Sequence, residues 1–310
     1  DMVVFSAYAV QVVMAFMMLT IIFIILPRAT VCAKRINEVL DTKLSILDGQ
    51  KDVSDISLRG EIEFKNVSFK YKDAKEYALK NISFTAHKGE IVAFIGSTGS
   101  GKSTLINLIP RLYDATSGEV LVDGINVKEY SKKDLNNKLG YVPQRAILFS
   151  GTVLSNVAYG IDETGDEILE KVKKSISVAQ GTDFIENMKN TYNGNIAEGG
   201  TNVSGGQKQR LNIARAIYKN PEIYIFDDSF SALDYKTDRN LRLELKKQTV
   251  DTTNIIVAQR IGTIKNADKI IVLDEGEIVG MGTHKELLKT CKVYREIAYS
   301  QLSKEELEDE

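Results

Sequence analysis

The chain begins with a long apolar stretch, and its later segments alternate hydrophobic and polar residues at shorter periods. Residues 2–26 carry no charged side chain. A helix over them would be about 37 Å long at about 1.5 Å per residue, enough to cross a hydrocarbon core of ~30 Å with some tilt. The pattern predicts a transmembrane helix over residues 1–28. A buried helix of a soluble protein is the alternative interpretation.

The residues that flank this stretch indicate its orientation. The chain starts with the acidic Asp1, whereas a secretory signal peptide starts with a basic region and ends at a small-residue cleavage site. The basic residues Arg28, Lys34 and Arg35 follow the stretch, which places its carboxyl end in the cytoplasm. Because Asp1 directly precedes this helix, we expect the sequence to be a fragment whose earlier membrane helices are missing.

A cytosolic stalk and linker are predicted over residues 29–58. Val31, Ile36, Val39 and Leu40 recur at helical spacing with charged residues between them, so the helix should continue beyond the membrane. Residues 49–55 are polar and break this period, as a linker does.

The period changes at residue 60, where a folded domain should begin. Apolar residues alternate with polar ones from residue 62 to 69 and from 79 to 84, which predicts antiparallel strands. Residues 91–95 form an unbroken apolar run, typical of a buried parallel strand. Further strands are expected near 118–124, 139–144, 223–228 and 255–259, a hairpin over 269–279, and helices over 104–112, 166–189 and 235–248.

The apolar run 91–95 leads directly into a phosphate-binding sequence. Glycines allow backbone N–H groups to converge on phosphate oxygens, and the following helix start adds its positive dipole end. Lys102 offers a point charge to the phosphates and Ser103 a hydroxyl ligand to Mg²⁺. A glycine-rich turn that matches by accident is the alternative. The residues expected to bind nucleotide here are Gly96, Ser97, Thr98, Gly99, Ser100, Gly101, Lys102, Ser103 and Thr104.

A second helix start with anion-binding chemistry lies further along the chain. Ser204 is a good N-cap residue, and Gly205 and Gly206 leave backbone N–H groups accessible at the beginning of a helix that stops at Asn220. One chain therefore contains two helix ends that favour phosphate groups.

Candidate catalytic groups sit at the ends of predicted strands. The apolar run 223–226 ends in Asp227 and Asp228, a pair suited to a Mg²⁺ ligand and a water-orienting base, although such a pair is also common in turns. Gln144 ends another strand, where glutamine is usually just solvated. Tyr71 precedes the phosphate loop, where an aromatic ring stacks on a nucleobase or is simply a surface residue.

Composition narrows the functional classes. The formal net charge of −2 and a pI near 5.9 argue against nucleic acid as a partner. The two cysteines, Cys32 and Cys291, lie far apart and resemble ordinary reduced residues. With only His87 and His284 present, a histidine-based metal site is not expected.

These motifs together resemble the ATP-binding cassette of the ABC exporter family, and specifically a half-transporter. Residues 96–104 are similar to the Walker A loop, 223–227 to Walker B and 203–207 to the family signature. The resemblance implies an α/β P-loop NTPase cassette over residues 59–300, with a RecA-like mixed sheet core, an antiparallel β subdomain and a helical subdomain, one transmembrane helix before it and an acidic tail over 301–310.

The resemblance also implies ATP and Mg²⁺ as cofactors and assigns roles to single residues. Two cassettes of the family pair head to tail, so the signature helix of one serves the nucleotide of the other. By this likeness Tyr71 stacks on adenine and Gln144 is the Q-loop residue. The implied catalytic residues are Asp228, Gln259, Gln144 and Lys102, the metal ligands Ser103, Gln144 and Asp227, the signature Ser204, Gly205, Gly206 and Gln207, and the D-loop Ser231, Ala232, Leu233 and Asp234.

Two residues depart from the family pattern. Asp228 stands where the family ordinarily has the general-base Glu, and Gln259 where it has the switch His. Losing one methylene withdraws the carboxylate by more than about an ångström, and general-base catalysis is worth roughly 10²–10⁴-fold. Gln259 still donates a hydrogen bond but carries no charge. The signature remains intact, so we expect a degenerate-site subunit of a heterodimeric exporter.

The expected partners are a second half-transporter, membrane lipid and a small-molecule export substrate of multidrug or lipid type, with no nucleic acid. The expected location is the cell membrane, multi-pass in the full-length protein, with the cassette on the cytoplasmic side. Other hypotheses are a non-hydrolysing nucleotide-regulated subunit, a homodimeric exporter with slow ATPase activity, and a soluble P-loop protein of repair or translation. The apolar residues 2–26 argue against the last.

Overall fold

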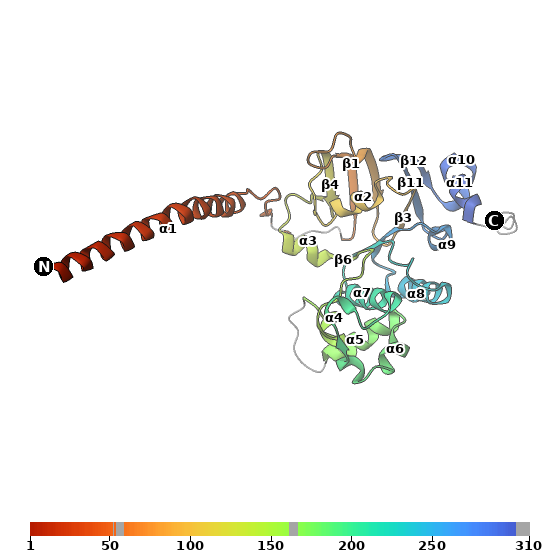
Figure 1. Cartoon of the computed structure of the whole chain (residues 1–310). Helices are drawn as coiled ribbons and strands as arrows, with labels where there is room; N and C mark the ends of the chain where they lie inside the picture. Colours follow the sequence, from red (N-terminus) through yellow and green to blue (C-terminus); the bar gives the residue numbers. More distant parts are fainter. Residues whose placement is uncertain (52, 54–58, 161–166, 302–310) are drawn as a thin grey trace. The chain divides into compact units, whose positions relative to one another are not determined.

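The computed structural model describes residues 1–51, 53, 59–160 and 167–301 (Figure 1). Contacts divide the chain into two units, Asp1–Leu47 and Asp48–Glu310. The predicted acidic tail beyond residue 301 and most of residues 52–58 of the predicted linker lie outside the described residues. The proposed division at residues 28 and 58 stays a prediction.

The first unit is formed by helix α1 (Met2–Leu40), which contains Pro27 in its interior. It is long and apolar enough to cross a membrane, and none of its residues is buried. Hydroxyl groups on the helix satisfy carbonyls of the preceding turn, as Thr30 Oγ1 does by donating to the Leu26 carbonyl at 2.8 Å. The helix continues through Pro27 to Leu40.

The second unit begins with a small antiparallel sheet. Its strand order is β2 (Leu79–Ala86), β1 (Ile62–Phe69), β4 (Ser117–Val122) and β5 (Ile125–Asn126). The apolar residues of β1 and β2 are buried, although register shifts between the two strands interrupt a strict alternation. The rings of Phe64 and Phe84 stack at 4.6 Å between centroids. The period of two that the sequence shows here is thus the spacing of a sheet with one buried face.

The larger sheet has the order β12 (Glu277–Gly282), β11 (Lys269–Asp274), β3 (Ile91–Ile95), β10 (Thr253–Val257), β9 (Ile223–Asp227) and β6 (Leu139–Val142). Neighbouring strands are parallel from β11 to β6, and β12 pairs antiparallel with β11. This mixed sheet confirms the predicted fold class. The carboxyl ends of β3, β10, β9 and β6 meet at one edge.

Some helices flank this sheet, and others form a separate group beyond β6 (Figure 1). The predicted helix 166–189 is interrupted by residues 179–181, and the helix after the phosphate loop ends four residues earlier than expected. The helices near the sheet are α2 (Lys102–Leu108), α3 (Lys132–Lys138), α8 (Tyr235–Gln248), α9 (Ile261–Ile264), α10 (His284–Thr290) and α11 (Lys292–Gln301). The helical group contains α4 (Val153–Val157), α5 (Glu167–Val178), α6 (Thr182–Glu186) and α7 (Gly205–Lys219), with β7 (Gly151–Thr152), β8 (Asn195–Ile196) and the 3₁₀ turns η1 (Thr191–Asn193) and η2 (Glu198–Gly200).

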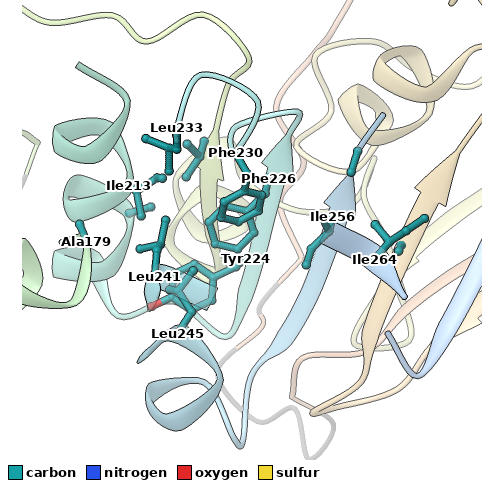
Figure 2. Close-up of a cluster of buried hydrophobic side chains, with 14 of the residues drawn as sticks. Ala179, Ile213, Tyr224, Phe226, Phe230, Leu233, Leu241, Leu245, Ile256 and Ile264 are labelled. Atoms are coloured by element: carbon teal, nitrogen blue, oxygen red, sulfur yellow. The ribbon is translucent and has the colours of Figure 1, made fainter. Parts of the chain in front are cut away.

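Two hydrophobic clusters cover the two faces of the larger sheet. Tyr224 and Phe226 of β9 point into the cluster shared with α7 and α8, which Figure 2 shows in close-up. Ile223 and Ile225 of the same strand belong to the cluster on the other face, with β1, β2 and α2. Because both faces are buried, the central residues of the parallel strands are apolar, and polar residues such as Thr253, Lys269 and Asp227 stand at the strand ends.

The start of the second unit is hydrogen-bonded to the segment before α3. The Gly49 N–H donates to the Tyr130 carbonyl at 3.0 Å, and the Lys51 N–H to the Glu129 carbonyl at 3.1 Å. Asp48 Oδ1 accepts from the Lys132 N–H at 2.6 Å. A Cβ at Gly49 would lie 2.1 Å from the Glu129 carbonyl oxygen, so this contact requires glycine.

Replacing Phe226 with Ala should destabilise the cassette. The side chain is 1% exposed and touches the rings of Tyr224 and Phe230, so truncation leaves a cavity and costs about 3–5 kcal/mol. Denaturant unfolding measures the change. The control is Leu243→Ala on α8, where the side chain is 52% exposed and the expected change is within about 0.5 kcal/mol. Equal losses in the two variants would contradict this packing.

Candidate nucleotide-binding site

The phosphate-binding sequence forms a tight loop between β3 and α2. Gly99 and Gly101 have φ angles of +86° and +99°, in the left-handed region that favours glycine. A Cβ at Gly101 would lie 2.8 Å from the Ala78 carbonyl oxygen, whereas one at Gly99 would meet nothing within 4 Å. Gly101 is therefore required because a side chain would collide with Ala78, just before β2, and because of its positive φ angle. Gly99 is required by its positive φ angle alone.

Lys102 lies inside this loop. Its Nζ donates to the Gly96 carbonyl at 2.8 Å and the Ser97 carbonyl at 2.7 Å. Burial lowers the Lys102 pKa, and the nearby Asp228 and Asp227 act in the opposite direction. The Lys102 ammonium group is thus held inside the curve of the loop by two backbone carbonyls.

Asp227, the last residue of β9, faces the phosphate loop across the sheet edge. Its Oδ1 accepts a hydrogen bond from Ser103 Oγ at 3.0 Å. Burial raises the pKa of Asp227, the Ser103 hydrogen bond lowers it and the charge of Asp228 raises it further. A hydroxyl and a carboxylate oxygen in contact are the hard oxygen donors that Mg²⁺ prefers, so these residues fit that ion.

The Asp228 carboxylate is bound by two glutamine side chains. Its Oδ2 accepts from Gln259 Nε2 at 2.8 Å and from Gln144 Nε2 at 3.3 Å. The backbone of Asp228 has φ +45°, and its N–H donates to the Val257 carbonyl at 2.9 Å. Burial raises the Asp228 pKa, while hydrogen bonds from Ser231 and Gln144 lower it. Asp228, Gln144 and Gln259 therefore form one hydrogen-bonded group.

Tyr71 lies at the other end of the loop. Its hydroxyl is 2.9 Å from Thr104 Oγ1, and its ring packs edge-on against Phe69 and Tyr113. The side chain is 37% exposed. One aromatic face is thus held close to the phosphate loop by its neighbours.

These groups line one pocket of about 350 Å³. It brings together Tyr71, the residues 98–104 of the loop apart from Ser100, both aspartates, Gln144 and Gln259. Every residue that the sequence suggested for the chain's own nucleotide site lines this pocket, except Gly96, Ser97 and Ser100, which accept hydrogen bonds from Lys102 Nζ.

The predicted signature residues do not line this pocket. Ser204 Oγ accepts from the Gln207 N–H at 3.3 Å and Gln207 Oε1 from the Ser204 N–H at 2.8 Å, a capping box at the start of α7. Ser204 and Gly205 are exposed. Of the D-loop, Leu233 is buried, and Asp234 caps α8 by accepting from the Thr237 N–H, which lowers its pKa.

Three residues of the site are not evident from the sequence. The Tyr141 hydroxyl donates to Asn107 Oδ1 at 2.9 Å, and burial, followed by the negative charge of Asp227, raises the Tyr141 pKa. Ala78, which directly precedes β2, and Val257, the last residue of β10, also line the pocket. Tyr141 is one of 13 tyrosines, and nothing in its own segment distinguishes it. Its position on β6, the strand that pairs with β9, brings it near Asp227. The sequence could have indicated this only if the order of the strands in the sheet had been known.

A glycine-rich loop after a parallel strand, with an acidic strand end opposite it, defines a P-loop nucleotide-binding cassette. Residues 79–231 match the family model described as ABC transporter. This match identifies the segment that contains the phosphate loop and both aspartates as the ATPase domain of an ABC transporter.

Its relatives carry the same domain. An uncharacterized ABC transporter ATP-binding protein of Mycobacterium tuberculosis is 45% identical over 303 residues, which are 97% of this chain and 52% of that protein. An ATP-dependent lipid A-core flippase of Ralstonia nicotianae is 38% identical over 267 residues, 86% of this chain and 45% of that protein. The structure of a bacterial Atm1-family ABC exporter with ATP bound superposes with a TM-score of 0.84 and 32% identity, over 93% of this chain and 50% of that one. The chain thus spans about half the length of the curated relatives it matches.

Replacing Asp227 with Asn should stabilise the nucleotide-free protein at neutral pH. Because burial raises the Asp227 pKa, the charged carboxylate costs stability above that pKa, and the cost disappears as pH falls below the unfolded value of about 3.9. We expect a gain on the order of 1 kcal/mol near pH 7.5, shrinking to nothing near pH 4, by denaturant unfolding.

The control for this variant is Asp234→Asn. Asp234 has a lowered pKa because it accepts backbone N–H groups, so neutralising it should give no gain at pH 7.5. A gain for Asp227→Asn that persists unchanged at pH 4 would show that charge burial is not its cause.

Proposed function

We propose that this chain is the ATP-binding/permease subunit of an ABC exporter with two unlike nucleotide sites. Its own site binds ATP-Mg and hydrolyses it slowly, and its signature helix completes a hydrolytic site on a different half-transporter. The exported substrate is a small molecule of multidrug or lipid type. The flippase among its relatives supports the lipid class.

The observation that carries the proposal is the state of the Asp228 carboxylate. Two amide donors bind its Oδ2, and its side chain is one methylene shorter than glutamate. A carboxylate that is withdrawn and already bound by two donors is a weak acceptor for the proton of an attacking water. The same site keeps Lys102, Ser103 and Asp227, which bind phosphate and the ion that accompanies it. Binding is therefore favoured over cleavage.

The roles of the remaining residues follow from their positions. Lys102 and the loop N–H groups hold the phosphates, and Tyr71 presents a ring to adenine. Ser103, Asp227 and Gln144 offer oxygen donors to Mg²⁺, which when bound neutralises phosphate charge. Gln259 orients Asp228 and donates a hydrogen bond without carrying charge.

The signature residues support a role outside this chain's own pocket. Ser204 and Gly205 are exposed at the capped N-terminus of α7, a helix of fifteen residues. This arrangement presents backbone N–H groups to an anion. A partner's nucleotide is the anion that completes this arrangement. The apolar helix α1 supports membrane anchoring, with the cassette in the cytoplasm and the full-length protein multi-pass.

A second candidate is a nucleotide-regulated subunit that does not hydrolyse ATP at all. The two amides on Asp228 favour it as well. Equilibrium ATP binding compared with single-site turnover separates the two, because only the first proposal gives product at this chain's own site. An ordinary homodimer with slow ATPase activity predicts instead that the purified chain is active without a second gene product.

Changing Asp228 to Asn should lower the ATPase activity of the purified exporter only slightly, whereas the matching change in the partner should abolish it. The reverse variant, Asp228→Glu with Gln259→His, should raise turnover at this chain's site at least about tenfold, toward the 10²–10⁴-fold that general-base catalysis supplies. Phosphate release from the complex measures both. Abolition of turnover by Asp228→Asn would contradict the degenerate site. We expect the neighbouring open reading frame to encode the partner, with Glu and His at the two positions.

Changing Ser204 to Ala should reduce ATP hydrolysis at the partner's site by about 10²-fold, because it removes an oxygen that organises the anion-binding helix start. The matched control is Thr283→Ala, which removes the same kind of capping box from α10. Each change costs about 1 kcal/mol of stability, but Thr283 lies outside the nucleotide chemistry. If both variants lost the same amount of ATPase activity, Ser204 would contribute only to the stability of the fold and not to ATP hydrolysis.

A further inference from the structure

The last residue of α11 is hydrogen-bonded to the segment that carries Gln259. Gln301 Nε2 donates to the Gln259 carbonyl at 2.8 Å, and Gln301 Oε1 accepts from the Ile261 N–H at 2.8 Å. The side-chain amide thus pairs with one acceptor and one donor of the backbone, two residues apart. Only a primary amide of this length offers both partners at once.

This segment depends on outside partners for its conformation. It joins the end of β10 to the four-residue helix α9, and both Gln259 and Arg260 are exposed. Arg260, the N-cap residue of α9, makes no side-chain capping hydrogen bond. The Ile261 N–H is one of the helix-start donors that α9 itself leaves unpaired, and Gln301 supplies its acceptor.

Helix α11 anchors Gln301 firmly. Helix α11 packs against α9, α10 and β11 (Figure 1). Its residues Tyr294 and Ala298 are fully buried, and the Tyr294 hydroxyl is hydrogen-bonded to His284 of α10. Gln301 follows Ala298 by three residues and Tyr294 by seven, so the three share one face of the helix. The amide is therefore attached to a packed helix, while the segment it binds is irregular.

Gln259 links Gln301 to the nucleotide site through two hydrogen bonds. The backbone of Gln259 is fixed by Gln301, and its side chain donates to Asp228 Oδ2 at 2.8 Å in the pocket. We propose that Gln301 is a positioning residue of the nucleotide site, holding the Gln259 backbone so that the Gln259 amide faces Asp228 and the γ-phosphate end of the pocket. This inference rests on the proposed nucleotide binding at this site, but not on the unlike partner.

The test uses the purified full-length exporter and measures how long nucleotide stays trapped on this chain. Radioactive 8-azido-ADP is trapped with beryllium fluoride, which needs no hydrolysis at this site, cross-linked by light at successive times, and assigned to this chain on a gel. Gln301→Met keeps the length and packing of the side chain but removes both hydrogen bonds. Gln301→Glu keeps the acceptor for Ile261 and loses the donor to Gln259. We expect both variants to release trapped nucleotide about tenfold faster, within the 10²-fold that a 1 Å misplacement costs.

Two comparisons separate positioning from a merely structural role. Initial ATP affinity should be unchanged in Gln301→Met, because the phosphate loop is intact. In a Gln259→Ala background, Gln301→Met should have no further effect on retention, since the residue it positions is gone. The control on the same helix is Tyr299→Ala, a 62% exposed residue whose change should leave retention unaltered.

Normal retention in Gln301→Met, or the same tenfold loss with and without Gln259, would overturn the inference. Both outcomes are readable whether the partner is a second copy or a different subunit. Failure of the azido nucleotide to label this chain at all would instead contradict the proposed nucleotide binding, so the two failures are distinguishable.

Discussion

The parallel pairing of β3, β10, β9 and β6 fixes where the polar groups of the nucleotide site lie. In register, Phe94 faces Val257, Val257 faces Asp227, and Val142 faces Phe226. The phosphate loop, the two aspartates, Gln144 and Gln259 all follow these residues by a few positions. Because the strands are buried on both faces, their positions are set by hydrophobic packing, and the site inherits that rigidity.

This frame also holds charges in an environment that opposes them. Burial lowers the Lys102 pKa and raises those of Asp227 and Asp228, while the opposite charges partly offset these effects. Such a cluster is stable only if its members cannot move apart, which the sheet ensures. The cluster also suits a polyanion that carries a divalent cation, because the polyanion attracts Lys102 and the cation attracts the two aspartates. Hydrophobic packing of the sheet already offsets the free-energy cost of burying these charges.

Much of the fold follows from local pattern. The period of two predicts β1 and β2, and the unbroken apolar runs predict β3 and β9. The glycines that precede Lys102 predict the loop between β3 and α2. Boundaries depend on tertiary contacts and were less accurate: α2 ends at Leu108, and Arg111 adopts φ +54° with its guanidinium bound to Asp114. Most residues predicted for the nucleotide site line one pocket because they lie at or just beyond the ends of strands, while their roles stay predictions. The pairing of Gln259 with Gln301, 42 residues apart, has no local signal.

The two departures from the family pattern belong to one arrangement. A shorter carboxylate at 228 leaves room for a donor, and the amide of Gln259 reaches it at 2.8 Å. A neutral donor satisfies a buried carboxylate by hydrogen bonding without adding charge to the pocket, and Gln144 completes the shell at 3.3 Å. Restoring only one of the two family residues would therefore disturb this hydrogen-bonded group without recreating a base that faces water. The two positions are coupled through a single oxygen, Asp228 Oδ2, and the function of this site follows from the pair and not from either residue alone.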